Sequence, residues 1–196
     1  MKISIVGKAK GWENAPYEGI VWGIHSHCLI RPFTMVWDMH QIDGEELVGR
    51  EDQKALTVCV NKNKVPYMTL KKHDNIPTSI AFPIEEMPLK YAESSIAYMI
   101  WYAYHVGADE IELFGVNMNA FDEYHQQLKS AEYWIGYVRG KGVKVTMNEP
   151  TAICKGQQGL YGYDYMNLSQ PTGSIYKGKA NTREDWEKID RERQLV

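Results

Sequence analysis

Short hydrophobic runs of β-strand type dominate the first half of the chain. Three runs rich in Val, Ile and Trp are predicted strands: Lys2–Val6, Ile20–Ile24 and Thr34–Asp38. The run Leu56–Val60 is expected to be a fourth, buried strand. Prolines in or beside Val65–Leu70 and Ser79–Phe82 favour edge strands or extended loops at those two runs.

The hydrophobic period lengthens from Ser94 onward. If the stretch up to Val106 is a helix, apolar residues lie on nearly all of its sides, which predicts a buried helix over about 93–106. Ser94 or Ser95 would be the N-cap of this helix, and Gly107 would end it.

A strand, a helix and another strand are predicted to follow. Glu110–Phe114 alternates like a strand, and apolar residues recur every three or four positions in Phe121–Gly140, a second long helix. Val143–Met147 is the next predicted strand. Helices that alternate with strands are typical of a parallel sheet.

The pattern fades beyond Pro150. Residues 156–178 are rich in Gly, Tyr, Gln and Ser, and the charged residues 177–196 indicate a solvated helix from about Thr182. We therefore expect one domain over 1–165 and a C-terminal extension over 166–196. The extension is interpreted as a lid, an oligomer arm or a surface helix, so a homo-oligomer stays open.

Composition narrows the function classes. The 196 residues carry a net charge of −3, and the pI of about 6.1 argues against a protein that coats nucleic acid by charge. No apolar run is long enough for a membrane span or a signal peptide, and the three cysteines form no CxxC pair. We expect a reduced, cytoplasmic compartment and no membrane partner.

Two predicted strand ends carry residues suited to chemistry. The turn that starts at Gly7 contains Lys8 and Lys10, so it could bind a phosphate or be a plain turn with surface lysines. Asp38 and His40 close another strand, where the carboxylate could orient the imidazole as a general base or form only a structural hydrogen bond.

A pair of histidines offers a weaker signal. His25 and His27 alternate like strand residues and could share one face, as the start of a metal site. A third ligand is not evident from the spacing, so a metal, Mg²⁺ included, is not supported.

Further polar residues lie at predicted helix starts and at one strand end. Ser94 and Ser95 could bind an anion or only cap their helix. Asn117 follows a strand and could hydrogen-bond a ribose or a base. One turn of the second long helix carries an acid, a phenol and an amide that suggest a polar pocket rim: Glu123, Tyr124 and Gln127.

An ordered set of motifs resembles a known group of proteins. The motifs are Lys2–Gly7, Val21–Gly23, Trp37–His40, Ser94–Met99, Gly107–Met118, Glu123-Tyr124-x-x-Gln127, Ile135-Gly136, Gly140–Val145 and Leu160–Gly162. In this order they resemble uncharacterised proteins of tailed phages and prophages over roughly residues 1–165. That group is distantly similar to the Rossmann-like superfamily of bacterial sialyltransferases and pterin pyrophosphokinase-like proteins.

This resemblance implies a nucleotide site. It places Gly7 on a phosphate turn and Ser94 and Ser95 in the region that contacts the nucleotide of an activated donor. The chain departs from the pattern because its first turn lacks the Gly-x-Gly-Pro-Ser form, Asn117 replaces an acid, and Leu128 stands where phage relatives carry Arg.

The sequence therefore predicts a three-layer, Rossmann-like α/β fold with a mainly parallel sheet and flanking helices. The predicted function is a phage-encoded, nucleotide-dependent transferase in the bacterial cytoplasm, a glycosyltransferase with a nucleotide-sugar donor and no permanently bound cofactor. His40 and Asp38 would be catalytic, Gly7, Lys8, Ser94, Ser95 and Asn117 would bind the nucleotide, and Glu123, Tyr124 and Gln127 the substrate.

Three alternatives stay open. The chain could be a binding protein that sequesters a host nucleotide signal, without catalysis. It could also be a pyrophosphokinase-like phosphotransferase, which would need magnesium-binding carboxylates. A DNA acceptor is not favoured by the acidic balance, although Lys8, Lys10 and Arg31 could contact a strand.

Overall fold

The structure, a computed structural model, describes residues 1–40, 51–118, 123–148 and 150–155. Residues Met1–Lys155 form one compact unit. The predicted boundary at residue 165 and the predicted helix near Thr182 lie outside the described residues. No helix within them is long and apolar enough to cross a membrane.

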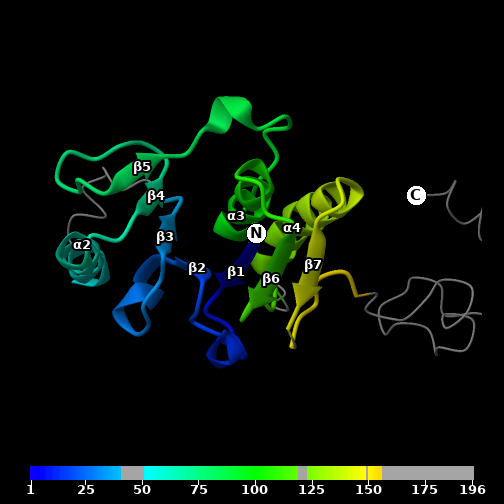
Figure 1. The fold of residues 1–196 in the computed structure, drawn as a ribbon, viewed down its shortest axis with the longest axis horizontal. Coiled ribbons are helices and arrows are strands. Elements are labelled where there is room, and N and C mark those ends of the chain that lie inside the picture. Colours follow the sequence, from blue (N-terminus) through cyan, green and yellow to red (C-terminus); the bar gives the residue numbers. More distant parts are fainter. Residues whose placement is uncertain (41–50, 119–122, 149, 156–196) are drawn as a thin grey trace, which may run out of the picture. The chain divides into compact units, whose positions relative to one another are not determined.

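Within the described residues, seven parallel strands form a single sheet. The strands are β1 (Lys2–Val6), β2 (Ile20–Ile24), β3 (Met35–Asp38), β4 (Tyr67–Thr69), β5 (Ser79–Ala81), β6 (Glu110–Phe114) and β7 (Lys144–Met147). Their order is β5-β4-β3-β2-β1-β6-β7, and every neighbouring pair is parallel. Figure 1 shows this row running from β5 to β7. Five of the predicted strands match these to within a residue.

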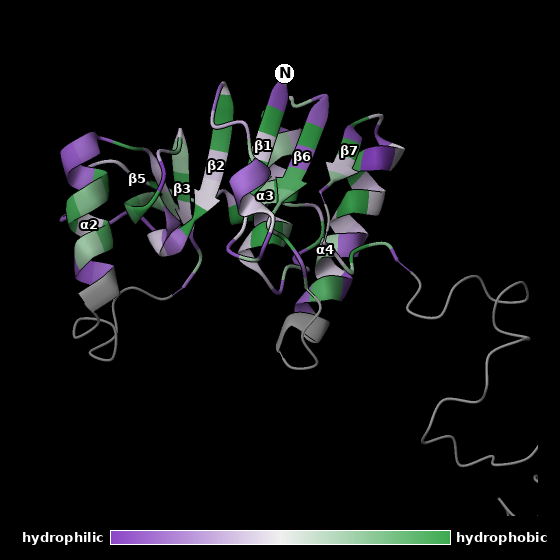
Figure 2. Ribbon diagram, turned by 90° about the horizontal axis from the view of Figure 1, so that it is seen from below, coloured by the Kyte–Doolittle hydropathy of each residue, from purple (hydrophilic) through white to green (hydrophobic). Residues whose placement is uncertain are grey.

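Hydrophobic side chains cover both faces of the sheet. Helices α3 (Ser95–His105) and α4 (Glu123–Gly140) pack on one face with Ile3, Ile5 and Trp37. Helix α2 (Glu51–Asn63) packs on the other face. Figure 2 shows hydrophobic residues along the central strands. This three-layer arrangement confirms the predicted Rossmann-like α/β fold.

Helix α2 corrects the strand predicted at Leu56–Val60. Leu56 and Val60 are both fully buried, whereas Val58 between them is 65% exposed. A buried pair four residues apart with an exposed residue between them follows the helical period, not the alternation of a strand. The apolar run was too short to distinguish the two periods.

Strand β4 corrects a second prediction, because it is not an edge strand. It lies between β3 and β5, and Tyr67 and Met68 are fully buried. Pro66 stands just before the strand, where its missing N–H is not needed and its carbonyl accepts a 2.9 Å hydrogen bond from Val36 N. Strand β5 is at the edge, as predicted.

The connections after β1 and β2 contain only short 3₁₀ segments. These are η1 (Trp12–Asn14) and η2 (His25–Leu29), and a third, η3 (Ile84–Glu86), follows β5. His25 and His27 therefore lie on η2 and not on a strand, which overturns the alternation expected for them. Both short connections begin at the carboxyl ends of parallel strands, so they lie at the same end of the sheet.

Candidate functional site

The order of the strands reverses at β1. The chain leaves β1 toward β2 and β3 on one side, and later places β6 and β7 on the other side. In sheets of this kind, ligands bind outside the carboxyl ends of the strands where the order reverses. The candidate site is therefore sought where β1, β2, β3 and β6 end.

Two glycines let the ends of β1 and β6 approach closely. Gly7 N donates to Phe114 O at 2.8 Å, and Ala9 N donates to Gly115 O at 2.9 Å. A Cβ atom on Gly7 would lie 2.4 Å from Gly115 O, and Gly115 itself has a positive φ of 60°. The Gly7 N–H already donates to Phe114 O, so it is not available to a phosphate. A phosphate at this turn would need other donors, and Lys8 is the nearest one in the chain.

A buried carboxylate, Asp38, lies at the end of β3. Its side chain is only 1% exposed, and its Oδ1 accepts hydrogen bonds from His40 Nδ1 at 2.6 Å and from His40 N at 3.1 Å. The His40 side chain is 69% exposed. The structure thus brings Asp38 and His40 into direct contact, with the carboxylate hidden and the imidazole open to solvent.

The second oxygen of this carboxylate is held from β4. Tyr67 Oη donates to Asp38 Oδ2 at 2.8 Å and accepts from Gln53 Nε2 of α2 at 3.4 Å. Burial by itself would raise the pKa of Asp38, but the hydrogen bonds from His40 and Tyr67 outweigh it, so the pKa lies below its usual value. Burial and the Asp38 charge raise the pKa of Tyr67. At neutral pH the pair is therefore a carboxylate and a neutral phenol.

His25 joins this group from the end of β2. Its Nε2 lies 3.6 Å from Asp38 Oδ2 and 3.3 Å from Gln53 Oε1, while its Nδ1 lies 3.4 Å from Lys8 Nζ. Lys8 also donates to Ser26 Oγ at 3.1 Å. The ring centroids of His25 and His40 are 5.9 Å apart.

These contacts link the ends of β1, β2 and β3 to Tyr67, the first residue of β4, and to Gln53 of α2. We call the following residues the Asp38 cluster: Lys8, His25, Asp38, His40, Gln53 and Tyr67. Sequence reasoning found Lys8, Asp38 and His40 but did not foresee that His25 would lie between them. Tyr67 and Gln53 were also missed. A signal for His25 existed, because it directly follows a predicted strand that precedes the strand ending at Asp38.

His27 takes no part in the Asp38 cluster. It is 3% exposed, and its ring packs against Trp12 and Phe33. Burial and the nearby Lys8 charge lower its pKa. His25 and His27 therefore have different surroundings, and within the described ranges no group of three or more His, Cys, Asp or Glu side chains is placed to hold a metal ion.

The predicted serines lie at the start of α3. Ser94 is the N-cap, and its Oγ accepts from Ala97 N at 3.2 Å. This contact confirms the prediction that Ser94 caps the helix. Ser95 is half-buried. Because α3 ends just before β6 begins, its N-terminus points toward the carboxyl ends of the parallel strands.

The start of α3 is tied to α4 near Gln127. Ser130 Oγ accepts from Glu93 N at 3.1 Å and donates to Gln127 O at 3.0 Å. The side chains of Glu123 and Tyr124, the other predicted substrate residues, lie outside the described part. Ser130 thus joins the backbone just before α3 to the backbone of α4 at Gln127.

Asn117 follows β6 and offers a buried acceptor. Its backbone oxygen accepts from Ala152 N at 2.8 Å, while its side-chain Oδ1 is buried and finds no hydrogen-bond partner among the described residues. A buried amide oxygen without a donor is costly, so a donor supplied by a ligand would stabilise this position.

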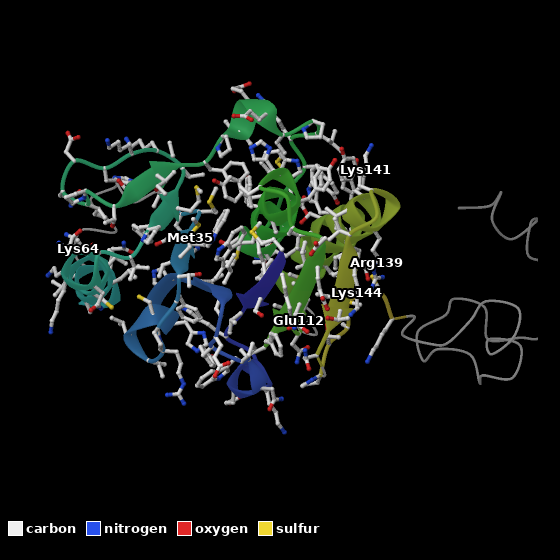
Figure 3. The ribbon with its side chains drawn as sticks, in the orientation of Figure 1. Met35, Lys64, Glu112, Arg139, Lys141 and Lys144 are labelled. Carbon is white, nitrogen blue, oxygen red and sulfur yellow. The ribbon has the colours of Figure 1, made fainter. Side chains whose placement is uncertain are left out.

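The basic side chains near β7 do not belong to this site. Figure 3 shows Arg139, Lys141 and Lys144 near the end of α4 and β7, toward the opposite end of the row of strands from β3. Arg139 donates to Val145 O at 2.8 Å, and Lys144 pairs with Glu110 at 2.8 Å. The Arg139 bond joins α4 to β7, and the Lys144 pair joins β7 to β6.

Comparison with known proteins supports the fold. No protein-family model matches the chain, and a search of curated proteins finds no match. Among solved structures, the sialyltransferase CstII from Campylobacter jejuni, in complex with the substrate analogue cytidine-5'-monophosphate (CMP), is similar with a TM-score of 0.50. The sequence identity is 11%, and the match covers 97% of this chain and 99% of that one. At this identity the similarity establishes a shared fold.

Proposed function

We propose that the protein is a nucleotide-dependent transferase, a glycosyltransferase that uses a nucleotide-activated sugar. The observation that carries the proposal is the buried Asp38 carboxylate bonded to the exposed imidazole of His40. The fold shared with a sialyltransferase that was solved with CMP supports it. The phage origin implied by the sequence resemblance belongs to the same proposal.

His40 is the proposed general base. With Nδ1–H donated to Asp38, Nε2 carries the lone pair and can take the proton of an acceptor hydroxyl. The acceptor oxygen then forms a bond to the sugar carbon as the bond from that carbon to the phosphate oxygen breaks. The electron pair leaves with the nucleotide, and Asp38 stabilises the imidazolium until its proton passes to water.

Lys8 is the proposed partner of the leaving phosphate. It follows Gly7 at the point where the strand order reverses, and its ammonium group can neutralise the charge that develops on the nucleotide. The Gly7 turn, Ser94 and Ser95 would hold the phosphates together with Lys8. Asn117 would bind the nucleoside, with its Oδ1 accepting from a ribose hydroxyl or a base amino group. Glu123, Tyr124 and Gln127 would face the other substrate.

A two-stage experiment tests this function. A thermal-shift screen of nucleotides and nucleotide sugars, with and without Mg²⁺, should identify a ligand that raises the melting temperature. Release of the nucleotide from the matching nucleotide sugar is then measured with candidate acceptors.

His40→Ala should lower turnover by about 10²- to 10⁴-fold and leave nucleotide binding largely intact. The matched control is His105→Ala, because His105 lies on α3 beside Glu86 and away from the Asp38 cluster. Full activity in His40→Ala would exclude the proposed base. Binding without turnover would instead indicate a nucleotide-sequestering protein, and Mg²⁺-dependent pyrophosphoryl transfer would indicate a pyrophosphokinase-like enzyme.

A further inference from the structure

We propose that His25 is a positioning residue that links the buried carboxylate of Asp38 to the ammonium group of Lys8, and so fixes Lys8 for the phosphate of the nucleotide. The inference rests on the proposed function for the identity of the ligand. The link between the three side chains rests on the contacts alone.

The backbone of His25 is held in an unusual conformation. Its φ is +42°, in the left-handed region that non-glycine residues seldom adopt. The residue follows β2 directly, between the ends of β1 and β3 in the sheet, and its side chain is only 13% exposed. Strained residues of this kind persist where surrounding contacts hold them, and they gather at functional sites.

The contacts of His25 favour one tautomer of its ring. An ammonium group can only donate, so His25 Nδ1, which lies 3.4 Å from Lys8 Nζ, must be an acceptor. The proton of the neutral ring is therefore on Nε2, where it faces Gln53 Oε1 and Asp38 Oδ2. A carboxylate beside the N–H of an imidazole makes the other nitrogen a better acceptor.

This tautomer has a consequence for Lys8. A lysine side chain is long and flexible, and ordering it on binding costs conformational entropy. Contacts to His25 and to Ser26 Oγ, at 3.1 Å, restrict it in advance. Lys8 is thus pre-organised beside Gly7, where the phosphate is expected.

Two substitutions separate the two contacts of His25. The amide group of Asn falls near the position of Nδ1 and can accept from Lys8, and Asn tolerates a positive φ. The longer side chain of Gln places its amide near Nε2, so it can still donate to Asp38 but cannot replace the acceptor for Lys8. His25→Asn is therefore the rescuing variant and His25→Gln the disruptive one.

Binding of nucleoside monophosphates, CMP first, is measured by calorimetry. Lys8→Met and His25→Gln should each weaken binding by about tenfold, His25→Asn should restore most of the affinity, and the double variant Lys8→Met/His25→Gln should be no weaker than Lys8→Met. Lys62→Met, an exposed lysine at the end of α2, is the control. Additive losses in the double variant would overturn the link.

Long-range ¹H–¹⁵N NMR of histidine rings in the wild-type protein gives an answer that needs no ligand. His25 should show a proton on Nε2 and a bare Nδ1 at neutral pH, and the Nδ1 resonance should move in Lys8→Met. A proton on Nδ1, or a resonance that ignores Lys8→Met, would overturn the proposal even if CMP binds. If the NMR result is as expected and no nucleotide binds, the proposed function and the assigned ligand fail, while the Asp38–His25–Lys8 link stands.

Discussion

Tyr67 Oη donates a 2.8 Å hydrogen bond to Asp38 Oδ2 across two neighbouring parallel strands. Both side chains are buried, with exposed fractions of 0% for Tyr67 and 1% for Asp38. Tyr67 thus bonds the carboxylate oxygen that His40 does not contact. Asp38 is therefore fixed from β3, β4 and the segment after β3 at once.

Removal of this donor should destabilise the protein. Tyr67→Phe leaves Asp38 Oδ2 with only the longer 3.6 Å contact to His25 and removes the Tyr67 partner of Gln53 Nε2. We expect this to cost about 1–3 kcal/mol in the free energy of unfolding by urea. The control is Tyr98→Phe, since the half-buried Tyr98 ring packs against Phe82 and its change should stay within about 0.5 kcal/mol. Equal losses in the two variants would show that the bond contributes nothing specific.

The stability of the fold should depend on the ionisation of Asp38. Its pKa in the folded protein is below the ordinary value of 3.8, so its contribution is present above the pKa of the unfolded chain and is lost as the pH falls through the folded pKa. Wild-type stability should thus fall more steeply below about pH 4 than that of Asp38→Asn, which should also be less stable at pH 7. Parallel curves for the two proteins between pH 3 and 7 would contradict this expectation.

The close approach of Gly7 to Gly115 makes a further prediction. Gly7→Ala would place a methyl group 2.4 Å from the backbone oxygen of Gly115, which directly follows β6. The ends of β1 and β6 must then separate, with an expected loss of about 3 kcal/mol or more. Gly136→Ala is the matched control, because it lies inside α4 with open space around it. It should stabilise the protein by about 0.5–1 kcal/mol. Thermal unfolding of both variants decides the point.

The two serines at the start of α3 can be told apart. Ser94→Ala removes the N-cap acceptor and should cost about 1 kcal/mol of stability. Ser95→Ala leaves the cap in place, so a drop in CMP affinity without a drop in stability would assign Ser95 to the nucleotide. Unchanged affinity in both variants would limit these serines to capping.

The central part of the fold could be predicted from local patterns. β1, β2 and β6 begin and end where the sequence predicts, because each is a short apolar run next to a glycine or a helix boundary. The strand predicted at Leu56–Val60 is wrong because five residues are too few to distinguish the hydrophobic period of a helix from that of a strand. Tyr67 was placed at an edge because Pro66 normally marks one, yet here the proline stands before the strand.

Prediction of the site was limited for a different reason. Asp38 and His40 are two residues apart, so their contact could be foreseen from the chain. The contacts of His25 with Asp38 and Lys8 join residues at the ends of different strands, and they depend on the order of strands in the sheet and on a left-handed backbone. The position of His25 directly after a predicted strand is a signal for its place at the site, but strand order and a left-handed backbone have no local signal in a single sequence.

The short segments η1 and η2, which replace helices after β1 and β2, have a dynamic consequence. Only a few hydrogen bonds close each of them, whereas α3 is continuous over 11 residues and packs against both the sheet and α4. Amide protons of η1 and η2 should therefore exchange with solvent deuterium far faster than those of α3. His25 lies at the start of η2, so its contacts to Asp38 and Lys8, rather than the hydrogen bonds of its own segment, would keep the site ordered above the protected sheet.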